Sequence, residues 1–338
     1  MKRSILVLAS ALCVGALVVG LSLLSRNSSK PAATHSDSTL QKTALAGAAV
    51  TDAAAQDSES LRQNGAARAS TAVQDSTSDP PSALATAIGK AGPIDFRGRL
   101  NAIGKLGPRL SVEERRALYD YLRDSTEEKS LRPGQSHALK NDILNVLREQ
   151  SDPPQELTQV LAALWRDSSQ PLVIRDYALQ HLAPWYARAE SGQRDQIIQE
   201  LREASAQTEQ SFAGTALIGL HRIQRENPGV VMPSLSDQIA RLVQDDTANL
   251  LARITAVQLG GGEDAIAMRD SLKRIAVDEA QPPTLRLAAL GSLGRLGGDE
   301  AAGALTRVAA GTDGRLALAA RSALSKLPRL KPSASSGE

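Results

Sequence analysis

The sequence predicts an all-α chain built as an α-solenoid, an array of about six to seven stacked helix pairs. Residues 278–298 show the pattern most clearly: a turn, two prolines suited to a first helical turn, apolar residues at three- and four-residue steps, and a glycine stop. Residues 167–184 repeat this plan, and residues 245–260 repeat it more loosely. No strand-like alternation interrupts the pattern, so we expect helices only.

A recurring apolar pattern gives the period of the repeat. A small or branched apolar residue, which we call the anchor, is followed by apolar residues at plus one and, in most repeats, plus four. Successive anchors lie 41, 35, 38, 40, 33 and 34 residues apart, which leaves room for two helices and two turns in each interval. The anchors are Ala102, Ile143, Ala178, Ala216, Ala256, Ala289 and Ala323.

Charged residues follow the same period. A basic residue stands three positions before five of the anchors, where it points into the apolar side of a helix and must be paired or reach water. An aspartate stands eleven positions before three of the anchors. The five basic residues are Arg99, Lys140, Arg175, Arg253 and Arg286. The pattern predicts a structural ladder that ties each turn to a second helix, with the pairs Asp167–Arg175, Asp245–Arg253 and Asp278–Arg286.

These units resemble the HEAT-repeat family over roughly residues 82–328, most strongly over residues 245–328. The resemblance implies a solenoid whose second helices line an inner surface, a surface usually used to bind other macromolecules. It implies no catalytic residues. The matching residues are Asp167, Pro171, Ile174, Arg175, Ala178 and Leu179 in one unit, and Asp278, Pro282, Leu285, Arg286, Ala289 and Leu290 in another.

The order of segments suggests an exported protein. Residues 1–25 contain a run of 20 uncharged residues, 5–24, which is long enough to span a bilayer at about 1.5 Å per residue. Two interpretations remain open: an uncleaved signal anchor, which the length favours, or a cleaved signal peptide. We therefore expect an inner-membrane-anchored chain facing the periplasm or exterior, or a secreted chain if the leader is removed.

Residues 26–81 are rich in small polar residues and predict a disordered linker. Residues 82–328 hold the solenoid, and residues 329–338 form a disordered tail. Within the solenoid, caps, prolines and apolar periodicity predict fourteen helices. Their expected ranges are 82–90, 94–106, 111–124, 136–149, 154–166, 171–187, 191–206, 210–226, 233–244, 247–260, 263–277, 282–296, 299–310 and 314–327.

Composition argues against several kinds of site. Residues 94–338 hold 31 Lys and Arg against 31 Asp and Glu, so the basic excess of a nucleic-acid-binding array is missing. The only cysteine, Cys13, lies in the apolar run, and the four histidines have no metal-ligand spacing. No catalytic constellation, cofactor motif or small-molecule site is indicated.

Four aromatic residues cluster within 22 positions of a chain that is poor in aromatics. They are Trp165, Tyr177, Trp185 and Tyr186. Such a cluster can be a hot spot for partner binding. It can equally fill the core of the central repeats, which we favour because aromatics dominate core energetics too.

Taken together, the sequence predicts a non-enzymatic protein-interaction scaffold. It would be tethered to the membrane through residues 5–24 and would bind a protein partner on the solenoid surface. Two alternatives stay open. One is a lyase-type enzyme on the same repeats, because relatives of the most regular unit are linked to bilin attachment by resemblance. The other is a structural spacer of the cell envelope.

Overall fold

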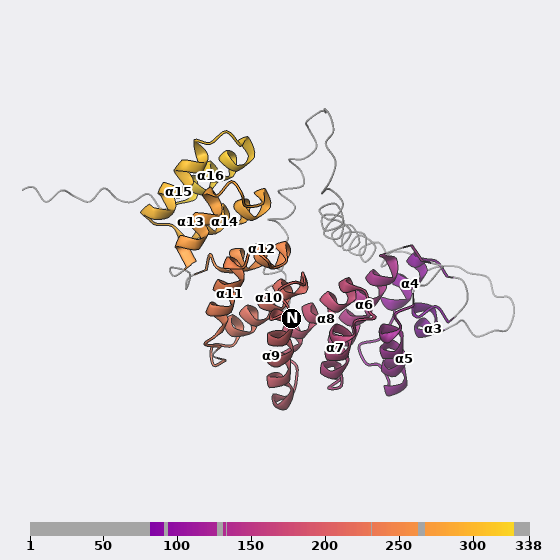
Figure 1. Ribbon diagram of the computed structural model, residues 1–338. Coiled ribbons are helices and arrows are strands. Elements are labelled where there is room, and N and C mark those ends of the chain that lie inside the picture. The colour runs from indigo at the N-terminus through magenta and orange to yellow at the C-terminus, as the bar shows by residue number, and fades with distance from the viewer. Residues whose placement is uncertain are drawn as a thin grey trace, which may run out of the picture. The chain divides into compact units, whose positions relative to one another are not determined.

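The computed structural model describes residues 82–90, 94–126, 131–132, 134–230, 232–262 and 268–327 of the chain. These residues form fourteen α-helices, and none of them belongs to a strand (Figure 1). The all-α prediction is therefore confirmed for this part. The predicted membrane or signal segment, the linker and the tail lie outside the described residues.

The helices pair in chain order, each pair consisting of a first helix, a turn and a second helix. The pairs are α3 (Ala83–Ala87) with α4 (Phe96–Ile103), α5 (Val112–Arg123) with α6 (Gln135–Arg148), α7 (Leu157–Arg166) with α8 (Leu172–Trp185), α9 (Ser191–Ser205) with α10 (Phe212–Glu226), α11 (Leu235–Gln244) with α12 (Leu250–Leu259), α13 (Arg269–Val277) with α14 (Pro283–Leu296), and α15 (Asp299–Ala309) with α16 (Gly314–Lys326).

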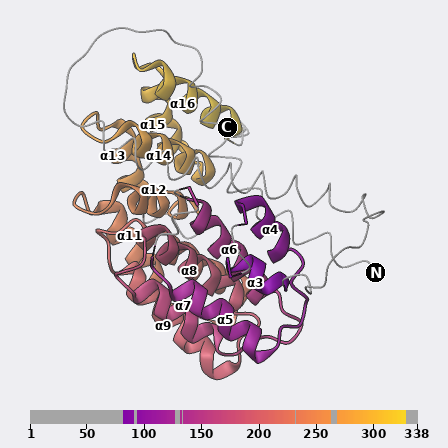
Figure 2. The ribbon, with the colours of Figure 1, turned by 90° about the vertical axis from the view of Figure 1, so that its right-hand side faces the viewer.

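Successive pairs stack on one another. Every second helix from α4 to α14 contacts the second helix of the next pair, and first helices contact across several of the same junctions. The helices follow one another in chain order from α3 to α16 in Figure 1, and Figure 2 shows the same helices after a turn of 90°. This is the connectivity of an α-solenoid, in which each unit touches only its neighbours.

Local sequence signals explain why the helices begin and end where they do. Ser111 caps α5, accepting from the backbone N–H of Glu114, while the Glu114 side chain accepts from the N–H of Ser111. Pro283 begins α14, where its missing N–H costs no helical hydrogen bond. Gly297 ends α14 with a φ of 67°, which favours glycine over residues with a side chain.

Small residues let neighbouring second helices approach closely. A Cβ on Gly294 would lie 3.0 Å from the Cβ of Ala323, so α14 and α16 pack here on two small residues. The sequence also predicts a close helix approach at Gly291, and this prediction is wrong. A Cβ there would meet only the flexible Arg295 side chain, at 4.0 Å.

The apolar core runs through all seven pairs. Leucine, isoleucine, valine and alanine side chains from both helices of each pair are buried in this core, including all seven anchors. Burial of apolar surface between neighbours is therefore the main stabilising term of this part.

No helix in the described ranges combines the length and apolar character needed to cross a bilayer.

Leu290→Ala tests this core. Leu290 is 0 % exposed, so its truncation is expected to lower the free energy of unfolding by about 2–5 kcal/mol. Leu318→Ala is the matched control, because Leu318 is 53 % exposed and its loss should cost less than about 0.5 kcal/mol. Urea unfolding of both variants would measure the difference, and equal losses would contradict this account of the core.

Candidate functional site

The turns that join the two helices of a pair are tied to each other in several junctions. We call these turns, together with the N-terminal halves of the second helices that follow them, the turn edge. The Gln170 side-chain amide donates to the carbonyl of Arg123 over 2.6 Å, and the backbone N–H of Asn249 donates to the carbonyl of Thr208 over 2.8 Å. The turn edge is therefore a connected surface, and it contains every residue of the predicted ladder.

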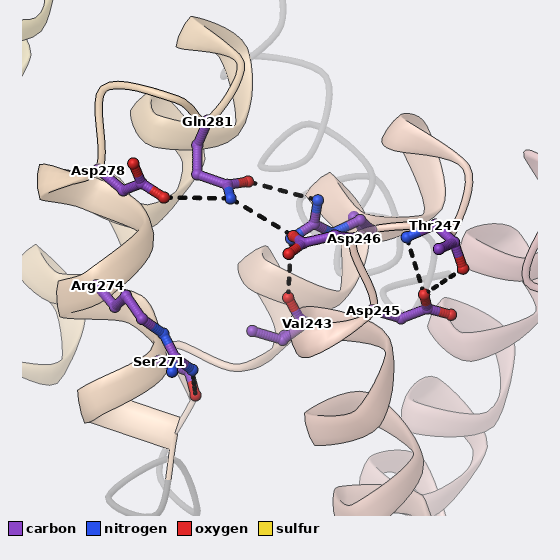
Figure 3. Close-up of polar contacts among 9 residues, drawn as sticks. Val243, Asp245, Asp246, Thr247, Ser271, Arg274, Asp278 and Gln281 are labelled. Carbon is purple, nitrogen blue, oxygen red and sulfur yellow. Dashed lines mark hydrogen bonds and ion pairs between the residues drawn. The ribbon is translucent and has the colours of Figure 1, made fainter.

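Each aspartate of the predicted ladder shapes its own turn. Asp167 accepts from the backbone N–H of Ser169, and Asp278 accepts from that of Ala280. Asp245 accepts from both the N–H and the hydroxyl of Thr247 (Figure 3). These local bonds are typical of aspartate in turns. Hydrogen bonds from Thr247 lower the pKa of Asp245, and hydrogen bonds from Ser169 lower the pKa of Asp167. The charges of the nearby ladder arginines contribute least to these two shifts.

The basic residues of the ladder cap the first helices instead. Arg175 Nε donates to the carbonyl of Trp165 over 2.8 Å, and Arg286 Nε donates to the carbonyl of Ala276 over 3.1 Å. Both carbonyls lie in the last turn of a first helix, where no helical N–H is left to satisfy them. A cation there also offsets the negative end of the helix dipole.

The ladder as predicted is therefore wrong: no ion pair joins Asp167 with Arg175, Asp245 with Arg253, or Asp278 with Arg286 among the described residues. The aspartate and the basic residue meet the same helix end but bond to different main-chain groups. Arg253 does form an ion pair, at 2.7 Å, but its partner is Asp246, one residue after the predicted aspartate.

Two glutamines at the turn edge are not among the residues that the sequence predicts for this site. Gln170 and Gln281 each stand three residues after a ladder aspartate and directly before a proline. The Gln281 side-chain amide faces Asp246 of the preceding turn and Asp278 of its own turn, at 3.4 Å each (Figure 3). The pattern Asp-x-x-Gln-Pro, present at residues 167–171 and 278–282, was the available signal.

The aromatic cluster fills the core and does not form a partner-binding surface. Trp165 and Trp185 are 2 % and 0 % exposed, and Tyr177 and Tyr186 are also buried. Trp185 Nε1 donates to the hydroxyl of Thr158 over 2.9 Å, and Trp165 Nε1 donates to Glu200 over 2.7 Å. Their polar atoms thus have partners inside the stack, as buried tryptophans require.

A buried histidine lies between α6 and α8. His181 is 4 % exposed, with Nε2 3.1 Å from the Asn141 side-chain oxygen and Nδ1 3.4 Å from Arg148 Nη1. Burial, aided by the positive charge of Arg148, lowers the pKa of His181 to about 3. The neutral ring is therefore the form that the fold holds near pH 7. The part of the chain that the structure describes contains no cluster of three metal-ligating side chains.

Two pockets open on the turn edge near the C-terminal end of the array. The first, of about 240 Å³, lies between the α11–α12 and α13–α14 turns and is lined by Asp246, Ala248, Leu250, Arg253, Ala280, Gln281 and Pro282. The second, of about 350 Å³, lies one pair further on and includes Glu279, Arg286, Arg307 and Asp313. A ladder arginine thus lines each of these two pockets.

Comparison with known proteins gives a distant structural likeness. A solved structure of human deoxyhypusine hydroxylase in complex with glycerol matches with a TM-score of 0.32 and 15% sequence identity, over 72% of this chain and 94% of that chain. No protein-family model matches the chain. No curated protein matches it either.

The expectation that this chain is not an enzyme is corrected by that match, because the matched protein is an enzyme. The expectation rested on the lack of a catalytic motif in the sequence, and such a lack does not exclude an activity. The likeness itself is too distant to assign an activity, a substrate or a residue role to this chain.

A double-mutant cycle tests the corrected ladder. Arg286→Ala leaves the Ala276 carbonyl without its donor and should cost about 1–3 kcal/mol of unfolding free energy. In the double variant, Asp278→Ala should lower the free energy of unfolding by the same amount as it does alone, to within about 0.5 kcal/mol, because the two side chains do not contact each other. The matched pair Asp246 and Arg253, which are in contact, should deviate from additivity by more. A coupled Asp278–Arg286 pair would contradict the assignment.

His181 should make the stability depend on pH. Its folded pKa of about 3 lies below the value of about 6.5 for an unfolded histidine, so the unfolded chain binds more protons between these values. The free energy of unfolding should therefore fall as the pH drops through this window, by at most about 1.4 kcal/mol per pH unit from this group. His181→Gln should flatten the curve measured by urea unfolding. Parallel curves for the two proteins would refute the assignment.

Proposed function

We propose that the chain is a HEAT-like solenoid that binds a protein partner along its turn edge. The observation that carries the proposal is the coincidence, on this edge, of exposed large apolar side chains with the two pockets. The proposal makes no statement about catalysis, and it fits the common use of extended repeat surfaces in binding.

The exposed apolar side chains favour this edge. Five large apolar residues are exposed in the described part of the chain, and four of them lie on second helices, within or next to their N-terminal halves. They are Leu172 on α8, Ile218 on α10, Leu251 on α12 and Leu318 on α16; the fifth, Val112, begins the first helix α5. Single exposed apolar residues are common, so their placement along one surface is the informative point.

Leu251 shows how the two features meet. Its neighbour Leu250 lines the first pocket, together with Ala280 and Pro282 of the next turn. An exposed leucine beside a partly apolar pocket suits the centre of a protein interface, where an apolar side chain of the partner is desolvated.

Export and tethering belong to the same proposal. They rest on the uncharged run of residues 5–24 in the sequence, which lies outside the described residues. An anchored solenoid would raise the effective concentration of a bound partner at the membrane surface.

Surface variants test the binding. The full-length chain would be used as bait for proteins extracted from its native cells, with quantitative mass spectrometry of the captured proteins. Leu251→Ser with Leu318→Ser should lower recovery of a specific partner about tenfold or more, since each leucine loses roughly 1 kcal/mol or more of apolar burial. Val112→Ser is the matched control, because it removes an exposed apolar side chain on a first helix.

Unchanged urea midpoints for all the variants would establish that folding is intact. Equal recovery by the turn-edge variant and the wild type would contradict the proposal. Failure of the wild-type chain to capture any specific protein would instead favour the envelope-spacer alternative.

A further inference from the structure

The junction between the α11–α12 pair and the α13–α14 pair is held mainly by its second helices. α12 packs along α14, whereas the first helices α11 and α13 make at most a marginal contact. Elsewhere α5 packs on α7, α7 on α9 and α13 on α15, the last with an ion pair between Lys273 and Glu300. Gln238 of α11 also donates to the hydroxyl of Ser205 on α9 over 2.7 Å. No hydrogen bond or ion pair joins α11 with α13 in the part of the chain that the structure describes.

The ends of α12 and α14 that lie away from the turn edge are tied closely together. The Ser292 hydroxyl donates to the carbonyl of Val257 over 2.7 Å, and Arg295 Nη2 donates to the carbonyl of Gln258 over 2.7 Å. Gly261 packs so tightly here that a Cβ on it would lie 2.8 Å from the Cβ of Ser292. This end is therefore a fixed contact about which the two pairs can rotate.

The turn-edge end of the same junction is loosely tied. The Gln281 side chain links the two turns, with its amide 3.4 Å from Asp246 and its oxygen 3.4 Å from Arg253 Nη1 (Figure 3). Both distances exceed those of well-formed hydrogen bonds, so the links are weak. The first pocket, of about 240 Å³, lies between the two turns. The turns therefore have room to approach each other.

The equivalent glutamine of another junction makes a shorter link to a different group. Gln170 reaches the carbonyl of Arg123, the last residue of α5, over 2.6 Å. Gln244 has the same place at the end of α11, since each of these two residues is followed by an aspartate that accepts from the N–H two residues later. Gln281 does not bond to the carbonyl of Gln244, and its amide is held by the side chain of Asp246 instead.

Arg253 departs from the regular pattern at the same place. In Arg175 and Arg286, Nε donates to the carbonyl ten residues earlier. For Arg253 that carbonyl, of Val243, accepts from Nη2 over 3.3 Å, and the buried Nε has no partner among the described residues. The same Nη2 lies 2.7 Å from Asp246. A buried N–H without an acceptor is costly, so the regular geometry would regain a hydrogen bond when the Asp246 contact is lost.

We propose that this junction has two states and that Asp246 holds it in the observed, open state. In the closed state Arg253 Nε donates to the carbonyl of Val243. Gln281 then reaches the carbonyl of Gln244, and the two turns close the pocket by rotation about the far ends of α12 and α14. Each state thus satisfies a different set of polar groups, which makes the junction a two-state element. A partner on the turn edge would shift the population toward the state that it fits.

Spin-label distances test the proposal in the full-length chain carrying Cys13→Ser. Gln244→Cys and Glu279→Cys place nitroxide labels on the two sides of the junction, at exposed positions that do not line its pocket. Double electron–electron resonance then gives the distance distribution. Asp246→Ala should raise the population of shorter distances about fivefold or more, because Arg253 Nε regains an acceptor only in the closed state. An identical distribution with and without this substitution overturns the proposal.

Two controls separate closure of this junction from a general effect. Glu209→Ala removes an exposed carboxylate from the α9–α10 turn and should leave the distribution unchanged. A second label pair, Glu279→Cys with Ala310→Cys, reports on the next junction, where α13 packs on α15. Its distribution should not respond to Asp246→Ala. An equal response at both junctions would show a loosening of the whole array, which also overturns the proposal.

Arginine side-chain spectroscopy gives a second readout. In the chain labelled with ¹⁵N-arginine, the Nε–H signal of Arg253 is identified as the one that disappears in Arg253→Lys. Asp246→Ala should move this signal downfield, because its proton gains a carbonyl acceptor. The signals of Arg175 and Arg286 already have acceptors and should stay in place. A change of distance without this shift, or the shift without a change of distance, contradicts the coupling of Arg253 to closure.

This inference goes beyond the proposed function and does not rest on it. Both measurements use the chain without a partner, so their failure would leave the binding proposal standing. Loss of partner capture in the surface variants would likewise say nothing about closure.

Discussion

The structure depends on a basic side chain that each of several second helices places against the end of its first helix. Arg99, Lys140 and Arg253 are buried, and each donates to a carbonyl in or just after the preceding helix. A buried charge is costly unless it is paired or hydrogen-bonded. Here the unpaired carbonyls of a helix C-terminus and its dipole supply that compensation. Because the donor reaches a fixed atom, it also fixes where the second helix crosses the first.

Much of this fold could be predicted because its signals are local. Each helix boundary depends on residues within a few positions of it, such as the Ser111 cap or Gly297 with its positive φ. The period of the anchors then follows, since a pair that cannot bury its apolar face alone must stack on a neighbour. The fourteen predicted helices accordingly correspond in order to α3 through α16.

The partners of polar side chains could not be predicted in the same way. The spacing of Asp278 and Arg286 correctly indicates that both reach the same helix end. It does not distinguish a carboxylate from a main-chain carbonyl as the acceptor, because every residue carries a carbonyl and the sequence does not mark which ones lack a donor. The burial of Trp165 had a similar limit, since it depends on Glu200 and Phe212 of the next pair. Sequence clustering alone does not place those residues beside it.

The repeats that break the capping rule are the informative ones. In the last pair, where no basic residue stands three before the anchor, Arg321 at the neighbouring position takes its place and donates to the carbonyl of Ala309 at the end of α15. This substitute keeps a helix-end carbonyl occupied. At Arg253 the carbonyl is also satisfied, but Asp246 turns the guanidinium and leaves Nε without an acceptor. A local departure from an otherwise consistent pattern is expected at functional sites, and this one coincides with a pocket.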